Sequence, residues 1–138
     1  MGKSNATALN VLQSVFLGTD PAFRSYGTLY ISLHTSDPGV GGTQVTNETA
    51  YTSYTRQSVV QTSGGWTVSG TTSSNVALIT FPSCTGSAGS PITYVAIGQS
   101  TTGGAGQILY SGVLNQSLVI ATGVAPQFAI GGLIVTES

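Results

Sequence analysis

The stretch Leu29-Tyr30-Ile31-Ser32-Leu33-His34 decides the fold class, because aliphatic and polar side chains alternate from one residue to the next. Three aliphatic side chains alternate with phenol, hydroxyl and imidazole groups. Side chains of a β-strand point alternately to opposite faces, so this stretch predicts a strand with one buried and one polar face.

Strand-like segments of the same kind follow to the end of the chain, separated by Gly, Ser and Pro residues that favour turns. Short segments at this spacing, with almost no helix among them, predict an all-β fold. We expect a β-sandwich of jelly-roll type, with an open barrel as the alternative. Gly64-Gly65 resembles a hairpin turn between two of the strands. The expected strands are Tyr54–Gln61, Gly65–Ser69, Val76–Phe81, Ile92–Gln99, Gln107–Leu114, Ser117–Thr122, Ala125–Ile130 and Leu133–Thr136.

A short amphipathic α-helix is expected before the strands, capped by Ser4 or Asn5 and continuing to Leu17. Gly18 provides a stop, and Pro21 follows it. A helix of about three turns is marginal alone, so its apolar stripe must pack on something. The partner is either its own β domain or a neighbouring subunit. The stripe consists of Ala8, Leu9, Leu12, Val15 and Phe16.

The length of 138 residues fits one domain. We expect residues 1–27 to form a helix and arm, and residues 28–138 to form the sandwich. No run of 18 apolar residues is present that would cross a membrane.

Charge is concentrated at the start of the chain, because six of its seven charged residues lie within the first 56. Residues 57–136 carry none, and the net charge is −1. This balance argues against nucleic acid or an anionic membrane as a partner. A surface rich in Thr, Ser and Gly suits packing against other protein better than chemistry, so we expect a structural or binding protein.

Candidates for catalysis or metal binding are few. His34 is the sole imidazole and Asp37 follows it, but Asp37 lies in the turn sequence Ser36-Asp37-Pro38-Gly39, where its expected role is a local backbone hydrogen bond. Cys84 is alone, so it forms neither an intrachain disulfide nor a zinc site. We therefore predict no enzyme activity, no cofactor and no metal.

Residues 35–50 read as a long loop, and its continuation from Asn47 to Arg56 concentrates polar, aromatic and charged groups. One interpretation is an ordered loop, in which Glu48 pairs with Arg56 or caps backbone amides while the tyrosines pack down. The other is a contact with a neighbouring subunit, since Tyr and Arg are enriched at interfaces.

An ordered set of motifs resembles a family of small tailed-bacteriophage virion proteins. The set begins with Leu29 to Gly39 and continues with Thr46-Asn47-Glu48. It then runs through Tyr51, Tyr54, Arg56, Gly64-Gly65-Trp66 and Ile79-Thr80-Phe81-Pro82. Some members of that family carry a tail-fibre label, and others resemble capsid decoration proteins with a β-sandwich fold. The resemblance implies a virion component.

We predict a capsid decoration (cement) protein that binds the outer surface of an icosahedral shell and clamps adjacent major-capsid subunits. Its expected partners are the major capsid protein and itself, as a dimer or trimer. Its expected location is the capsid surface, after assembly in the host cytoplasm. The alternative is a tail-associated or tail-fibre protein, with Trp66 and the tyrosines as a platform for host glycans. The candidate interface residues are Leu9, Leu12, Val15, Phe16, Asp37, Glu48, Tyr51, Tyr54 and Arg56.

Overall fold

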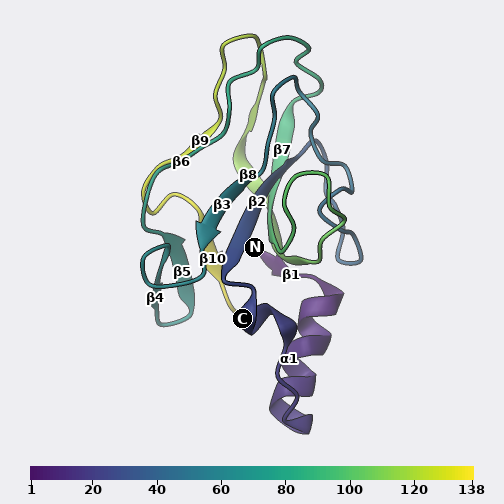
Figure 1. Cartoon of the computed structure of the whole chain (residues 1–138), viewed down its shortest axis with the longest axis vertical. Helices are drawn as coiled ribbons and strands as arrows, with labels where there is room; N and C mark the ends of the chain where they lie inside the picture. The colour runs from purple at the N-terminus through teal and green to yellow at the C-terminus, as the bar shows by residue number, and fades with distance from the viewer.

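The computed structural model describes residues 1–138 as ten strands, one α-helix and one 3-10 helix (Figure 1). Antiparallel pairing joins every neighbouring pair of strands. In chain order the elements are β1 (Gly2–Lys3), α1 (Asn5–Leu17), η1 (Ala22–Ser25), β2 (Thr28–His34), β3 (Gln57–Val60), β4 (Trp66–Ser69), β5 (Thr72–Asn75), β6 (Ile79–Thr80), β7 (Ile92–Gly98), β8 (Ile108–Leu118), β9 (Gln127–Phe128) and β10 (Ile134–Thr136).

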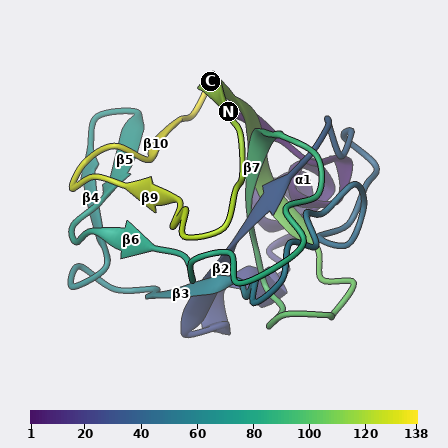
Figure 2. The ribbon, with the colours of Figure 1, turned by 90° about the horizontal axis from the view of Figure 1, so that it is seen from above.

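The strands form one large and two small sheets. The large sheet has five strands in the order β1-β8-β7-β2-β3, and the small ones have the orders β10-β5-β4 and β6-β9. Seen from above, the small sheets lie on one side of the molecule, with β2, β7 and α1 on the other (Figure 2). This arrangement confirms the all-β sandwich with one short N-terminal helix. These sheet orders do not confirm the finer jelly-roll prediction.

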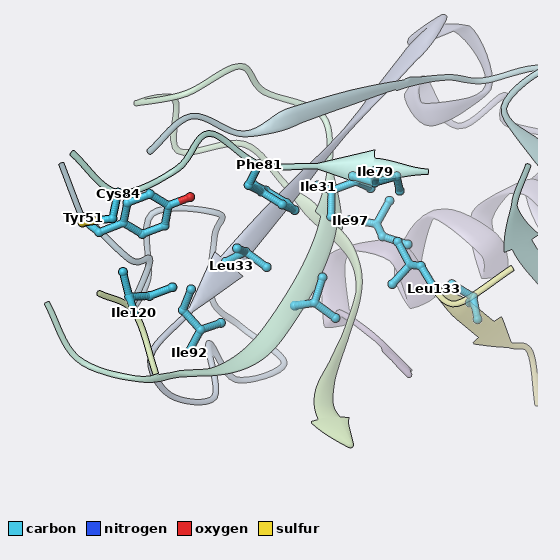
Figure 3. Close-up of a cluster of buried hydrophobic side chains, with 12 residues drawn as sticks. Ile31, Leu33, Tyr51, Ile79, Phe81, Cys84, Ile92, Ile97, Ile120 and Leu133 are labelled. Carbon is cyan, nitrogen blue, oxygen red and sulfur yellow. The ribbon is translucent and has the colours of Figure 1, made fainter. Parts of the chain in front are cut away.

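The core lies between these layers and consists of twelve buried residues. Ile31 and Leu33 of β2 and Ile92 and Ile97 of β7 contribute from the large sheet. Phe81 approaches them from the opposite side, as Figure 3 shows. The apolar positions of the alternating stretch therefore face inward, as predicted.

The polar face of β2 is also covered, which corrects the prediction that only one face of this strand is buried. Ser32 and His34 are fully buried. The loop between β2 and β3 folds back over them, and Gln44 Nε2 donates a hydrogen bond of 3.1 Å to the Tyr30 carbonyl. The polar groups on this face of β2 bond to the loop and to each other instead of to water, so they are buried with hydrogen-bond partners.

The helix has the predicted bounds. The Ser4 side chain accepts a hydrogen bond of 3.1 Å from the Thr7 amide, which is an N-cap. Gly18 ends the helix in the left-handed conformation at φ 65°, which glycine adopts without a steric penalty.

Several predicted strand boundaries are wrong. Most of the expected strand Gln107–Leu114 and the first two residues of the expected strand Ser117–Thr122 lie in the single strand β8, which ends at Leu118. An irregularity in its pairing with β7 accommodates the polar residues between them. Strand β5 was not expected, since its sequence Thr-Ser-Ser-Asn has no apolar alternation. The hairpin predicted at Gly64-Gly65 is absent, because β3 and β4 do not pair. The hairpin instead joins β4 to β5, across Gly70 and Thr71.

Candidate interaction surface

The helix α1 is attached to its own domain through polar side chains. Thr7 is buried, and its hydroxyl donates a hydrogen bond of 3.2 Å to the Ile108 carbonyl of β8. Gln107 Nε2 donates bonds of 3.1 Å to Asn10 Oδ1 and to Thr7 Oγ1. Thr7 and Asn10 are three residues apart and therefore share a helix face. This face, and not the apolar one, is turned toward the sheet.

The apolar stripe of the helix is left in solvent. We define the stripe as four of the residues predicted for it, whose exposed fractions are 55 % for Leu9, 55 % for Leu12, 68 % for Val15 and 75 % for Phe16. No residue of the helix is charged. The helix projects from one end of the β domain in Figure 1. Exposed apolar patches of this kind mark interaction surfaces, so the stripe is the first candidate.

The second predicted contact region, the loop 35–56, encloses a buried ion pair. Arg56 Nε donates to Glu48 Oε1 and Nη2 donates to Oε2, each at 2.7 Å, which is the bidentate geometry that guanidinium and carboxylate prefer. The Arg56 side chain has no exposed surface, and that of Glu48 has 11 %. Tyr54 donates its hydroxyl proton to Glu48 Oε1 at 2.8 Å and accepts from the Leu33 amide at 3.0 Å.

The remaining donors of Arg56 hold a second loop in place. Nη1 lies within hydrogen-bond distance of the carbonyls of Ser100 (2.9 Å), Thr101 (2.7 Å) and Gly104 (2.8 Å). The Arg56 amide donates to Thr102 Oγ1 at 2.8 Å. The arginine therefore connects the loop 35–56 to the loop between β7 and β8.

These contacts confirm the ordered-loop interpretation of the segment Asn47 to Arg56. Tyr51 is buried, and its hydroxyl donates to the Pro82 carbonyl at 2.7 Å. Burial and the neighbouring Glu48 carboxylate raise the pKa of Tyr54, which keeps the phenol protonated as a donor. The predicted interface role of Glu48, Tyr51, Tyr54 and Arg56 stays a prediction, and these side chains have little free surface. Asp37 is exposed, and its carboxylate accepts from the Gly39 amide at 2.8 Å, as the turn sequence predicted.

His34 has a structural environment. Its Nδ1 donates to the Thr46 carbonyl at 2.8 Å, and its Nε2 lies 2.9 Å from Ser32 Oγ. Burial lowers the pKa of the imidazole, which favours the neutral form that accepts from Ser32. Asp37 makes no hydrogen bond to His34, so the arrangement considered for catalysis is not assembled. No group of three His, Cys, Asp or Glu residues is placed to hold a metal ion.

Trp66 borders a largely apolar cleft of about 780 Å³ between the large sheet and the β10-β5-β4 sheet. Leu29 and Tyr110 line it from the large sheet, and Val135 lines it from β10. The Trp66 indole nitrogen is buried without a hydrogen-bond partner. Of the aromatic residues predicted to form a glycan platform, Trp66 and Tyr110 lie at this cleft, and glycan binding stays a prediction.

Sequence reasoning missed the residues that orient the helix, Thr7, Asn10 and Gln107. Thr7 and Asn10 recur at helical spacing opposite the apolar stripe. That signal was available, but it was outweighed by the expectation that the apolar face of a helix packs on its own domain.

The fold and these surfaces can be compared with known families. The family model described as "Podophage GP4 fiber I protein gp80" matches residues 2–136 of the chain. The chain belongs to this gp80 family. Membership confirms the resemblance to small tailed-phage virion proteins, so the chain is a structural protein of a phage virion. No curated protein matches the chain.

Membership in the gp80 family also bears on location, because it is a family of virion proteins. Among the helices of the structure, none combines the length and the apolar character required to span a membrane.

Proposed function

We propose that the chain is a subunit of the tail-fibre apparatus of a podophage and attaches to a neighbouring virion protein through the apolar stripe of α1. The observation that carries this proposal is the inverted orientation of the helix, with Thr7 and Asn10 toward the sheet and the stripe in solvent. The fibre description of the family model favours the tail over the head.

The stripe is large enough to contribute substantially to such a contact. Its exposed fractions equal about two and a half fully exposed side chains, so complete burial stabilises a contact by roughly 4–8 kcal/mol. Association costs about 4–15 kcal/mol in lost translational and rotational freedom. The stripe is therefore an anchor that needs further contacts or several linked copies. Because the helix is uncharged, the attachment should tolerate high salt.

Capsid decoration, the function predicted first from the sequence, is the second candidate. It is favoured by shape, since the two layers form a short body with no elongated shaft (Figures 1 and 2). Such a body suits the joints between major-capsid subunits, where symmetry multiplies modest contacts. Neither function requires catalysis or a cofactor, and both place the chain in the assembled virion.

Cryo-electron microscopy of purified virions, with copy number from quantitative mass spectrometry, separates the two candidates. We expect a few to a few dozen copies, with density confined to the tail and α1 in contact with a neighbouring protein. Hundreds of copies repeated over the icosahedral surface would reject the fibre role and establish decoration.

A further inference from the structure

The cleft of about 780 Å³ lies between the two layers of the domain. Strands β4, β5 and β10 line one side of it, and strands β2, β7 and β8 line the other. Figure 2 shows β2 and β7 opposite the small sheets. This volume falls within the range of roughly 300–1,000 Å³ that small-molecule sites occupy, so the cleft can hold a ligand.

The cleft has an apolar floor and a rim that carries hydroxyl groups. Ile97, Leu109 and Val135 line the cleft and are buried, so they form its floor. Thr62 and Thr72 also line it but are exposed, so they lie at its rim. An apolar surface with a few polar groups around it is typical of sites for organic ligands.

The rim hydroxyls keep hydrogen-bonding capacity for a ligand. Thr62 Oγ1 accepts a bond of 3.2 Å from the Gly64 amide, which leaves its proton available. Thr72 Oγ1 donates a bond of 3.0 Å to the Ser69 carbonyl, which leaves a lone pair available. One free donor and one free acceptor suit a sugar, because each sugar hydroxyl both donates and accepts.

The charges in the lining argue against an ionic ligand. Glu137 is the one charged residue that lines the cleft, and its carboxylate is bound by Lys3 Nζ and by the Tyr110 hydroxyl. An anion would find no free cation in the lining, and a cation would find a carboxylate that is already paired. Since burying an unpaired charge is costly, the lining favours a neutral ligand.

Trp66 supplies a flat apolar surface and an unused donor. The polarised C–H groups of a pyranose ring are attracted to the negative face of an aromatic ring. The indole nitrogen of Trp66 is buried without a hydrogen-bond partner, which costs free energy. A ligand carbonyl that displaces the groups covering this nitrogen would supply the missing acceptor. An acetamido group carries such a carbonyl, and its methyl suits the apolar floor.

We propose that the cleft binds a neutral N-acetylated saccharide. One sugar ring packs on Trp66, the acetamido carbonyl accepts from the indole nitrogen, and sugar hydroxyls bond to Thr62 and Thr72. A purely aliphatic ligand would bury the rim hydroxyls without giving them partners. No residue of α1 lines the cleft, so the inference does not depend on the attachment proposed for the helix.

Isothermal titration calorimetry of the purified full chain with two matched pairs of sugars tests the proposal. Triacetylchitotriose is paired with cellotriose, and N-acetylgalactosamine is paired with galactose; the second sugar of each pair has a hydroxyl in place of each acetamido group. We expect at least one N-acetylated probe to bind about tenfold or more tightly than its counterpart, because a buried donor gains its acceptor. No binding, or a smaller preference in both pairs, would overturn the proposal.

A substitution at the rim locates the binding site. Val68 lines the cleft and is 75 % exposed, so Val68→Arg should fold normally and weaken binding of the preferred N-acetylated probe about tenfold or more by obstructing the cleft. Val119→Arg is the matched control, because Val119 is 68 % exposed and does not line the cleft, and its affinity should equal that of the wild type. Binding that Val68→Arg leaves unchanged would overturn the proposal.

A substitution of the tryptophan tests the acetamido contact by itself. Trp66→Phe keeps an aromatic face and removes the indole donor, so it should abolish the preference for the N-acetylated sugar over its counterpart. Circular dichroism should show that this variant and both arginine variants are folded. A preference that persists in folded Trp66→Phe protein would refute the role of the indole nitrogen and with it the proposed recognition.

Discussion

Replacing Arg56 by methionine removes the positive half of the buried ion pair while keeping most of the side-chain volume. Five side-chain hydrogen bonds are lost, two to the Glu48 carboxylate and three to carbonyls of the loop between β7 and β8. The Glu48 carboxylate would remain almost entirely buried, with the Tyr54 hydroxyl as its remaining donor.

The expected loss of unfolding free energy is about 3–5 kcal/mol, the usual cost of leaving one partner of a buried pair without its counter-charge. A domain of this size has a total stability of roughly 5–15 kcal/mol, so the variant should unfold at a clearly lower urea concentration. Trp66 fluorescence and far-ultraviolet circular dichroism report the transition.

Two further variants separate burial from charge. Arg24→Met removes an exposed cation paired with Asp20, and it should change stability by no more than about 0.5 kcal/mol. Arg56→Met combined with Glu48→Gln should be more stable than Arg56→Met alone, because the buried charge is then gone. A loss below about 1 kcal/mol for Arg56→Met would refute the claim that this pair holds the two loops together.

Three further outcomes are expected. Alanine at both Leu12 and Phe16 should lower the unfolding free energy by less than about 1 kcal/mol, because both side chains are exposed. The same variant should attach to virions about tenfold or more weakly. Normal attachment in a binding assay would show that α1 is not part of the interface. The pKa of His34 is lowered in the folded state, so its contribution to the unfolding free energy is present above pH about 6.5 and is lost as the pH falls further. Urea titrations should give a lower unfolding free energy at pH 5 than at pH 7, and His34→Gln should reduce this difference. Gly98→Ala should lower the unfolding free energy by about 1–3 kcal/mol, since the added Cβ would lie 2.3 Å from Gln44 Cδ. The Cβ of Gly2→Ala would meet no atom within 4 Å, so this control should leave stability unchanged. Thermal unfolding of both variants measures the difference.

The elements with strong local signals could be predicted from the sequence. Ser4 and Gly18 define the ends of α1 by capping chemistry that depends on neighbouring residues alone. The alternation from Leu29 to His34 places β2 correctly for the same reason, because the period of two belongs to the strand itself.

Features that depend on distant residues could not be predicted. Strand β5 is polar throughout and exists because β4 and β10 pair with it on both sides. His34 is buried because the loop between β2 and β3 folds over it, and the residues next to His34 in the sequence do not predict this covering. At the candidate interface, the stripe itself was predicted, but its exposure depends on hydrogen bonds that join Thr7 and Asn10 to residues 101 and 97 positions away.

The hydrogen bonds that attach α1 to β8 and Gln107 affect the rate and order of assembly. Hydrogen bonds are directional, so the contacts of Thr7 and Asn10 fix the rotation of the helix about its axis before any partner arrives. The binding surface is therefore already formed before a partner binds, and no segment of this chain has to become ordered on binding. Attachment should follow the kinetics of two rigid bodies, with a rate proportional to the concentration of free subunits and no slow folding step after the encounter.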